Sequence, residues 1–321
     1  MTTEPHFYDV RVTSIAFEVE GIHSFELKPI GAAQLPRFSA GAHIELHLSN
    51  GMQRSYSLLN DSTERDRYVI AISRNPKGRG GSRFIHDKLQ VGQTIRISAP
   101  RNNFELNECA NATVLISGGI GITPLLSMIE RLEHLGLPWQ LHYCARSHKH
   151  AAFLERLIAR GFLGAGKLVV HLDDEAGHIV DLNTIVASAP ADAHLYCCGP
   201  TPMLDGFLKA AEKRPSEQVH LEYFSAKEAP ALEKGFRVVL RRSNREFFIA
   251  PGRTILQTLI DAGIDVAYSC MEGVCGACET IVMEGEPDHR DVVLTEAERR
   301  TNKTMMICCS GCKGEKLKLD L

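Results

Sequence analysis

The sequence has almost no net charge. Its 36 Lys and Arg residues stand against 39 Asp and Glu residues, which leaves a formal net charge of −3. A protein that binds nucleic acid or an anionic membrane through its overall charge needs a marked excess of basic residues. We therefore expect neither nucleic acid nor a membrane among its partners.

Uninterrupted apolar stretches are also missing. The most apolar stretch, residues 112–129, contains three glycines and Pro124 near its middle, whereas a membrane-spanning helix needs about 20 consecutive apolar residues. The N-terminus, MTTEPHFYDV, has no basic segment followed by an apolar run and so predicts no signal peptide. We expect a cytoplasmic protein whose ten cysteines are reduced or metal-bound.

The first hundred residues predict short strands. Apolar and polar residues alternate in 43–48 and again in 68–72, as in strands with one buried face. Asn50-Gly51, between two such runs, predicts a hairpin with a type I′ turn. Strands at this spacing, with little helix between them, favour an antiparallel β-barrel, to which we assign residues 1–106.

One strand of this barrel carries side chains that suit a flavin. Arg54-Ser55-Tyr56-Ser57 places Arg54 and Tyr56 on one side and the two hydroxyls on the other. An isoalloxazine ring needs an aromatic neighbour and hydrogen bonds along its edge, and a flavin phosphate suits Arg. An ordinary strand with a surface arginine would read the same way.

A glycine-rich turn follows in the same barrel. Gly80, Gly81 and Ser82 lead into a predicted helical turn at 84–89. Exposed backbone N–H groups and a hydroxyl at a helix start suit a phosphate. A flexible surface loop is the alternative.

The middle of the chain, residues 107–225, changes to the pattern of a parallel α/β sheet. The apolar strand at 112–117 runs directly into Gly118, Gly119, Gly121 and Thr123. We expect Thr123 to cap a helix that starts at Pro124 and ends at Gly136. A strand, a glycine turn and a helix start form the geometry that holds a pyrophosphate, although Pro124 replaces the third glycine of the usual fingerprint.

A second loop of the same kind follows the strand at 193–198. Cys198, Gly199 and Pro200 precede a Thr-Pro helix start. Further strands at 140–145 and 167–172, with a helix at 151–160 between them, complete a βαβα alternation. Ligands of such sheets lie beyond the carboxyl ends of the strands, where both loops are predicted to be.

Asp173 and Asp174 follow the strand that ends at Leu172. A carboxylate beside the adenosine ribose favours NADH over NADPH, because it accepts a hydrogen bond from the free hydroxyl and repels a phosphate. A solvated acidic turn is the alternative reading.

The C-terminal part begins after a predicted linker at 226–235, which is rich in Ala, Glu, Lys and Pro. We assign residues 236–321 to a compact module with a hairpin and a helix at 254–262. Cys270, Cys275 and Cys278 follow the C-x4-C-x2-C spacing of plant-type 2Fe-2S ferredoxins. A structural zinc site is the alternative, although zinc sites favour paired C-x2-C units.

Taken together, the motifs resemble one family along essentially the whole chain. They are RSYS, GRGGS, SGGIGITP, YCCGP, HLEYF, CMEGVCGAC, EGEPDHRD and KLKLDL. In this order they are similar to the reductase components of Rieske-type oxygenases, of the phthalate dioxygenase reductase and vanillate demethylase reductase type. The resemblance implies an FMN-binding β-barrel, an NAD-binding α/β domain and a C-terminal β-grasp ferredoxin domain.

The resemblance also implies roles for individual residues. Arg54, Tyr56 and Ser57 would contact FMN, with Gly80, Gly81 and Ser82 near its phosphate. Gly119, Gly121 and Thr123 would face the dinucleotide, and Cys198, Gly199 and Pro200 would lie near the nicotinamide. Phe224, in HLEYF, would cover the flavin ring until nicotinamide displaces it.

The fourth cluster ligand has three candidates in MMICCSGC, namely Cys308, Cys309 and Cys312. In an extended strand Cys308 and Cys309 point to opposite faces, so only one of them can reach the cluster. The resemblance places the last ligand in a hydrophobic-Cys-x-Ser pattern, which selects Cys308.

We therefore predict a monomeric NADH-dependent oxidoreductase that passes electrons through FMN and a 2Fe-2S cluster to a Rieske-type oxygenase. The cofactors carry the chemistry and the protein holds them. A diiron monooxygenase or a free ferric chelate as acceptor is an alternative, and a zinc-stabilised binding protein is an alternative from another class.

Overall fold

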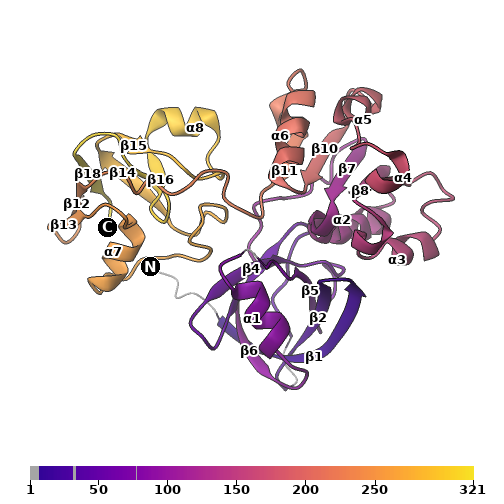
Figure 1. Cartoon of the computed structure of the whole chain (residues 1–321), viewed down its shortest axis with the longest axis horizontal. Coiled ribbons are helices and arrows are strands. Elements are labelled where there is room, and N and C mark those ends of the chain that lie inside the picture. Colours follow the sequence, from indigo (N-terminus) through magenta and orange to yellow (C-terminus); the bar gives the residue numbers. More distant parts are fainter. Residues whose placement is uncertain (1–6, 32–33, 77) are drawn as a thin grey trace. The chain divides into compact units, whose positions relative to one another are not determined.

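The computed structural model describes residues 7–31, 34–76 and 78–321. The chain forms two compact units, Met1–Glu222 and Tyr223–Leu321 (Figure 1). The first unit contains both the predicted barrel and the predicted α/β domain, so the finer boundaries at residues 106 and 225 remain predictions. Among the described residues, none of the helices combines the length and apolar character needed to cross a membrane.

A six-stranded antiparallel sheet begins the first unit, in the order β4-β3-β6-β1-β2-β5. Ile44 and Leu46 of β3 point into its apolar core, as the alternation predicts. The elements are β1 (Phe7–Val19), β2 (Ile22–Pro29), β3 (His43–His47), β4 (Gln53–Ser57), β5 (Tyr68–Ser73), α1 (Gly81–Lys88) and β6 (Thr94–Ser98).

The hairpin between β3 and β4 is present, but its predicted turn type is wrong. A type I′ turn needs positive φ at both central residues, and of the pair only Gly51 has it, at 81°. Leu48 N–H donates to Met52 O at 2.8 Å, and the Asn50 side chain accepts from Met52 N–H at 3.1 Å. The loop is therefore one residue longer than a two-residue turn.

A five-stranded parallel sheet forms the rest of the first unit, in the order β11-β10-β7-β8-β9. This confirms the predicted α/β alternation. Its elements are β7 (Thr113–Gly118), α2 (Ile122–Leu135), β8 (Trp139–Ala145), α3 (Leu154–Ala159), β9 (Leu168–Leu172), α4 (Asp173–Ala176), α5 (Leu182–Ser188), β10 (His194–Cys198), α6 (Thr201–Ala210) and β11 (Val219–Glu222).

The start of α2 differs from the prediction. The helix begins at Ile122 after a 3-10 turn at Gly119–Gly121, and Gly121 is its N-cap. Thr123 therefore lies inside the first turn, where its hydroxyl donates to Ile120 O at 3.0 Å. The 3-10 turn runs continuously into α2, and this removes the need for a threonine cap. Gly136, with φ of 65°, ends the helix as predicted.

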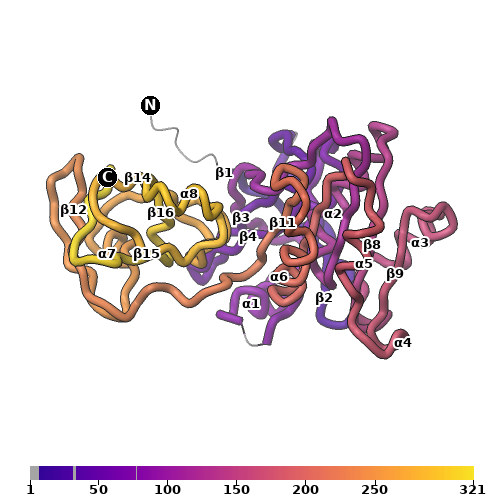
Figure 2. Tube along the Cα trace, turned by 90° about the horizontal axis from the view of Figure 1, so that it is seen from above, coloured from indigo at the N-terminus to yellow at the C-terminus, as the bar shows by residue number. Residues whose placement is uncertain are grey.

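The second unit contains a mixed sheet in the order β13-β12-β18-β14-β16, in which β12 and β18 are parallel. Helix α7 follows the β12–β13 hairpin (Figure 2) and starts with a capping box between Thr254 and Gln257. This is the predicted β-grasp ferredoxin fold. The elements are β12 (Phe236–Leu240), β13 (Arg245–Ile249), α7 (Ile255–Asp261), β14 (Glu279–Glu284), β15 (Pro287–Asp288), α8 (Glu296–Thr301), β16 (Thr304–Met306), β17 (Gly311–Cys312) and β18 (Lys316–Leu319).

Part of the predicted linker is bound to this second unit. Ala231 N–H donates to Cys309 O at 2.8 Å, and Leu232 O accepts from Gly252 N–H at 2.9 Å. The C-terminal end of the predicted linker at 226–235 is therefore anchored by backbone hydrogen bonds.

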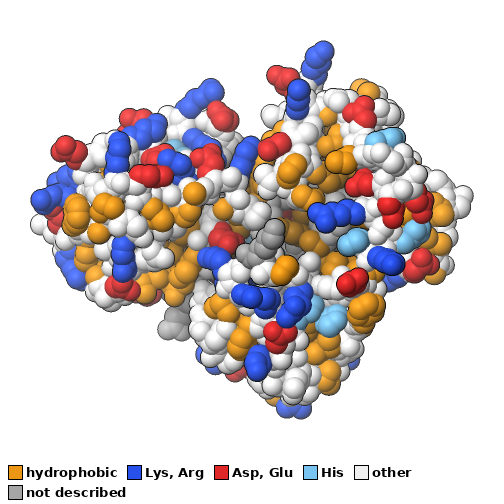
Figure 3. Space-filling view, in the orientation of Figure 1, with side chains coloured by type: hydrophobic (Ala, Val, Ile, Leu, Met, Phe, Trp, Pro, Cys, Tyr) orange, Lys and Arg blue, Asp and Glu red, His pale blue; other side chains and the backbone are white. Residues whose placement is uncertain are grey.

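On the face shown in Figure 3, basic and acidic side chains are interspersed, as the near-zero net charge suggests.

Candidate functional site

Arg54 and Gly81 bring the predicted flavin strand and the glycine-rich turn together. A Cβ at position 81 would lie 2.8 Å from Arg54 Cγ, closer than real Cβ contacts, so any larger residue there would displace the arginine side chain. The Arg54 guanidinium donates to Gln53 O at 2.7 Å. Strand β4 and the start of α1 thus form one cationic corner.

The start of α1 fits a phosphate group. Gly80 is the N-cap with φ of 92°, and no side chain among the described residues caps the helix. Ser82 Oγ instead accepts from Asn75 N–H at 3.0 Å, which fixes the preceding loop. Because N–H groups at a helix start attract anions, the corner of Arg54, Gly80 and Gly81 can hold the phosphate of a flavin.

Tyr56 and Ser57 continue along β4 from this corner. Burial raises the pKa of the Tyr56 phenol, so the ring presents a neutral aromatic surface. Ser57 is buried and hydrogen-bonds to the carboxyl group of Glu222 at the end of β11. The structure therefore brings Ser57 to the carboxyl edge of the parallel sheet.

Glu222 is a residue of the site that sequence reasoning missed. Its Oε2 is buried and has no hydrogen-bond partner in the described part of the chain. Burial raises the pKa of Glu222 to about 8, and the hydrogen bond from Ser57 only partly offsets this effect. The carboxyl group is therefore largely protonated at neutral pH. Glu222 is the register partner of Cys198, and this shared strand end was the signal that could have found it.

The two predicted glycine loops lie against one another at the ends of β7 and β10. A Cβ at Gly118 would lie 2.7 Å from Pro200 Cδ, and one at Gly121 would lie 2.8 Å from Gly199 N and overlap the carbonyl of Cys198. Gly119 has φ of 54° and open space around it. Close approach of the backbones therefore requires Gly118 and Gly121, and Gly119 leaves room for a ligand.

Asp173 lies at the same edge of the sheet, directly after β9 and at the start of α4. Its neighbour Asp174 donates its N–H to Arg146 O at 3.0 Å, which ties the turn to the end of β8. Since Gly118, Asp173 and Cys198 end parallel strands or follow them, the structure places these predicted dinucleotide residues at one edge of the sheet.

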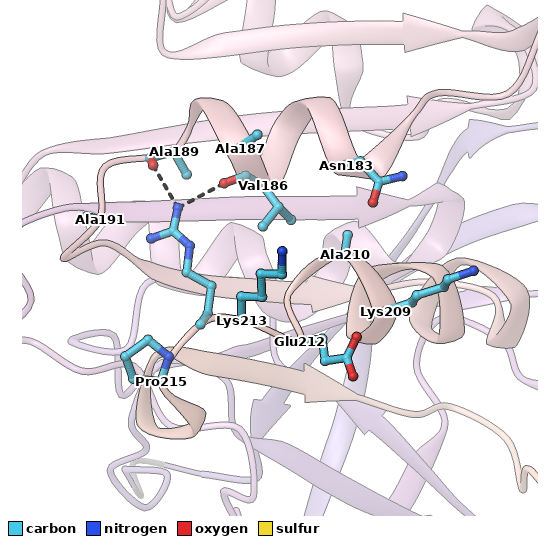
Figure 4. Close-up of a pocket in the computed structure, with 11 residues that line it drawn as sticks. Asn183, Val186, Ala187, Ala189, Ala191, Lys209, Ala210, Glu212, Lys213 and Pro215 are labelled. Carbon is cyan, nitrogen blue, oxygen red and sulfur yellow. Dashed lines mark hydrogen bonds between the residues drawn. The ribbon is translucent and has the colours of Figure 1, made fainter.

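A groove of about 690 Å³ lies elsewhere, between the carboxyl ends of α5 and α6 (Figure 4). Arg214 stands across it and donates to the carbonyls of Val186 and Ala189 at 2.9 and 2.7 Å. These helix ends lead into the amino ends of β10 and β11. The groove is therefore at the opposite edge of the sheet from the glycine loops and has no part in the dinucleotide site.

In the second unit, the four predicted cluster ligands are buried, although no group of three or more His, Cys, Asp or Glu side chains in the described part of the chain is close enough together to hold a metal ion. Cys270, Cys275, Cys278 and Cys308 are each at most 7 % exposed. Cys270 hydrogen-bonds to both Cys275 and Cys308 through its thiol, and its N–H donates to Cys275 Sγ at 3.5 Å. Glu272 N–H donates to Cys270 Sγ at 3.3 Å. Soft sulfur donors with N–H groups directed at them fit a 2Fe-2S cluster.

The other two candidate cysteines lie differently. Cys309 Sγ points to Met306 O at 3.8 Å and Ser310 Oγ at 3.9 Å, although it also hydrogen-bonds to Cys308. Cys312 is on β17, opposite Pro287. Of the three, Cys308 is the one whose thiol contacts Cys270.

Phe224 is 40 % exposed. It belongs to the second unit, which begins at Tyr223, and its predicted role over a flavin stays a prediction.

Comparison with known proteins identifies two segments of the chain. Residues 10–106 match the model of an oxidoreductase FAD-binding domain, and residues 238–313 match that of a 2Fe-2S iron-sulfur cluster binding domain. The second match covers Cys270, Cys275, Cys278 and Cys308 and favours an iron-sulfur cluster over a structural zinc site.

Whole-chain relatives agree with these matches. The chain is 51 % identical over 312 residues to phenoxybenzoate dioxygenase subunit beta of Ectopseudomonas oleovorans, covering 97 % of both chains. It is 42 % identical to vanillate O-demethylase oxidoreductase of Pseudomonas putida, covering 98 % of this chain and 99 % of the relative. A solved structure described as phthalate dioxygenase reductase, with modular electron transfer from pyridine nucleotides to 2Fe-2S, superposes with a TM-score of 0.78 at 38 % identity, covering 98 % of both chains.

Proposed function

Since this chain belongs to the family of phthalate dioxygenase reductases, we propose that its donor is NADH, its flavin is FMN and its acceptor is a Rieske-type oxygenase. The chain is an oxidoreductase that passes electrons from a pyridine nucleotide through a flavin to a 2Fe-2S cluster and on to an oxygenase. We further propose that it acts as a monomer in the cytoplasm, where its thiols stay reduced.

The contact between Arg54 and Gly81 is the observation that supports the proposed flavin site. Arg54 and the α1 N-terminus at Gly80 and Gly81 bind one terminal phosphate, which is the group that FMN presents. Ser82 holds the loop at Asn75. Tyr56 packs against the ring, and Ser55 lies on the opposite side of the strand.

Ser57 would hydrogen-bond the edge of a bound flavin that receives the hydride. When bound, the flavin accepts two electrons as a hydride and releases them singly to the cluster. Ser57 orients the flavin edge and Glu222, protonated by its buried setting, keeps a proton at its carboxyl oxygen beside the Ser57 hydroxyl. Cys198 closes this site from β10, and burial raises the pKa of its thiol, so that the thiol stays neutral.

The dinucleotide binds along the carboxyl edge of the parallel sheet. Gly118, Gly119 and Gly121 admit the pyrophosphate, and Gly199 and Pro200 border the nicotinamide. Thr123 supports the α2 start through its bond to Ile120. Asp173 selects NADH by accepting from the ribose hydroxyl.

The cluster would be held by Cys270, Cys275, Cys278 and Cys308. Four thiolates and backbone N–H donors hold the cluster in a buried loop, which excludes water from it.

The test is an anaerobic titration of the purified holoprotein with NADH and, in parallel, with NADPH. If NADH bleaches the flavin and cluster absorption at a lower concentration than NADPH, the donor assignment is supported. An equal response to the two nucleotides would contradict it. The flavin released by heat is then identified by chromatography, where FAD would refute the FMN proposal. The rate of NADH oxidation is then measured with a Rieske oxygenase, a diiron monooxygenase or a ferric chelate as the electron acceptor, and these rates rank the acceptors.

A further inference from the structure

The segment at residues 288–292 ties together both parts of the proposed cluster site. Asp288 pairs with Gly311 across β15 and β17. Arg290 N–H donates to Ser310 Oγ at 3.2 Å, and Val292 N–H donates to Gly273 O at 2.9 Å. The segment therefore bridges the loop of Cys270 and Cys275 and the turn that follows Cys308.

Asp291, within this segment, has a carboxylate that is completely buried. Its Oδ1 accepts hydrogen bonds from Val293 N–H at 3.0 Å and Leu294 N–H at 2.8 Å. Its Oδ2 is buried and has no hydrogen-bond partner in the described part of the chain. A buried, incompletely compensated carboxylate is costly, so this position calls for a functional reason.

The Cα and Cβ of Asp291 lie against the cluster loop at Gly273. Asp291 Cα and Cβ would be 3.1 and 3.3 Å from a Cβ at Gly273, and Cys309 Sγ would be 2.5 Å from it. Gly273 has φ of 71° and lies between Cys270 and Cys275. Glycine therefore lets Asp291 approach the loop more closely than any other residue would allow.

The charged groups around Asp291 do not neutralise its Oδ2 by hydrogen bonds. His289 Nδ1 is 3.8 Å from Oδ2, beyond hydrogen-bond distance. Arg299 donates to the backbone carbonyl of Asp291 and not to its carboxylate. Arg290 is directed to Asp288 at 2.8 Å and Glu228 at 3.6 Å.

We propose that the buried negative charge of Asp291 lowers the reduction potential of the 2Fe-2S cluster and so favours delivery of its electron to the oxygenase. The proposal rests on the cluster assignment made above. An added electron is repelled by a fixed anion close by in a medium of low dielectric constant. Net charge near a cluster is one of the properties that set its potential.

The decisive variant is Asp291→Asn. The Asn side chain has nearly the same shape, and its Oδ1 can still accept from Val293 and Leu294, so the change removes charge with little change in geometry. We expect the equilibrium constant for cluster reduction to rise about tenfold, which is about 59 mV for a one-electron couple.

Asp288→Asn is the matched control. It makes the same change in formal charge on the same segment, but Asp288 is partly exposed and bound to Arg290. Solvent screens such a charge, so we expect less than a threefold change. Asp291→Glu, which keeps the charge, should stay near the potential of the wild type.

The experiment is a redox titration of the full-length holoprotein with dithionite and mediators, followed by electron paramagnetic resonance of the reduced cluster. A raised potential in Asp291→Asn alone supports the proposal. An unchanged potential in Asp291→Asn, or an equal shift in Asp288→Asn, would overturn it. Loss of iron and sulfide from Asp291→Asn would also overturn it, because Asp291 would then serve to hold the loop in place. Absence of a 2Fe-2S signal in the wild type would instead refute the proposed function.

Discussion

The aliphatic stem of Arg54 lies directly over the Cα of Gly81, so closely that a Cβ there would be 2.8 Å from Arg54 Cγ. A Cβ at position 81 would therefore require the Arg54 side chain to move. The guanidinium donates to Gln53 O at 2.7 Å, while the stem of Arg54 lies against the start of α1 at Gly81. A phosphate bound there meets a full positive charge and a helix N-terminus together.

Gly81→Ala is expected to weaken flavin binding about tenfold, which corresponds to about 1.4 kcal/mol. The methyl group would push Arg54 away from the helix start and separate the two phosphate contacts. Equilibrium dialysis or fluorescence titration of apoprotein with FMN measures the change. Gly164→Ala is the control, because its Cβ would meet its nearest neighbour at an ordinary 3.7 Å; equal losses in both variants would argue against the phosphate corner.

Glu222→Gln is expected to change how the stability of the first unit depends on pH. Burial raises the pKa of Glu222 to about 8 in the folded protein, against about 4.3 in an unfolded chain. Folding therefore favours the protonated form, and this stability is fully present below pH 4 and is lost as pH rises through 8. Gln mimics the protonated carboxyl at every pH.

The measurement is the thermal midpoint of wild type and Glu222→Gln between pH 5 and pH 9. We expect the midpoint of the wild type to fall relative to that of the variant, by an amount that corresponds to about 1–3 kcal/mol in the free energy of unfolding over this range. Parallel curves for the two proteins would show that Glu222 ionises normally. Glu217→Gln is the control. Glu217 is exposed in the 3-10 turn directly before β11, so the pH dependence of this variant should follow that of the wild type.

Local sequence patterns predict the helices and strands. The features that they do not predict depend on contacts between elements that are far apart in the sequence. Ile44 and Leu46 alternate with polar residues along β3, so the strand is visible in the sequence, although His43 and Glu45 on its other face are buried as well. Glu222 gives no such signal: its role comes from meeting Ser57, which belongs to another sheet, and its pKa depends on that burial. The sequence predicts Thr123 as a helix cap because Thr-Pro is a common helix start. The preceding 3-10 turn, which the sequence does not reveal, moved the helix start to Ile122.

Asp173→Asn is expected to reduce the preference for NADH over NADPH about tenfold, measured as the ratio of kcat/KM values. The change removes the charge that repels a ribose phosphate and keeps a hydrogen-bond acceptor for the hydroxyl. Asp174→Asn is the control, since Asp174 is exposed and its backbone N–H, which the change leaves in place, donates to Arg146 O. If both variants shift the ratio equally, the turn acts through its overall charge and Asp173 has no specific role.

Cys308→Ser is expected to lose the visible absorption of the iron-sulfur cluster, whereas Cys309→Ser and Cys312→Ser retain it. The Cys308 thiol contacts Cys270, and Cys309 Sγ points to Met306 O and Ser310 Oγ. Serine is a poorer ligand for iron than a thiolate because its oxygen is a harder donor. Iron and sulfide are assayed in each purified variant, together with flavin content as a check that the first unit is intact. Loss of the cluster from Cys309→Ser with retention in Cys308→Ser would reverse the assignment. Loss from both would mean that Cys309, through its contact with Gly273, is needed to keep the loop in place.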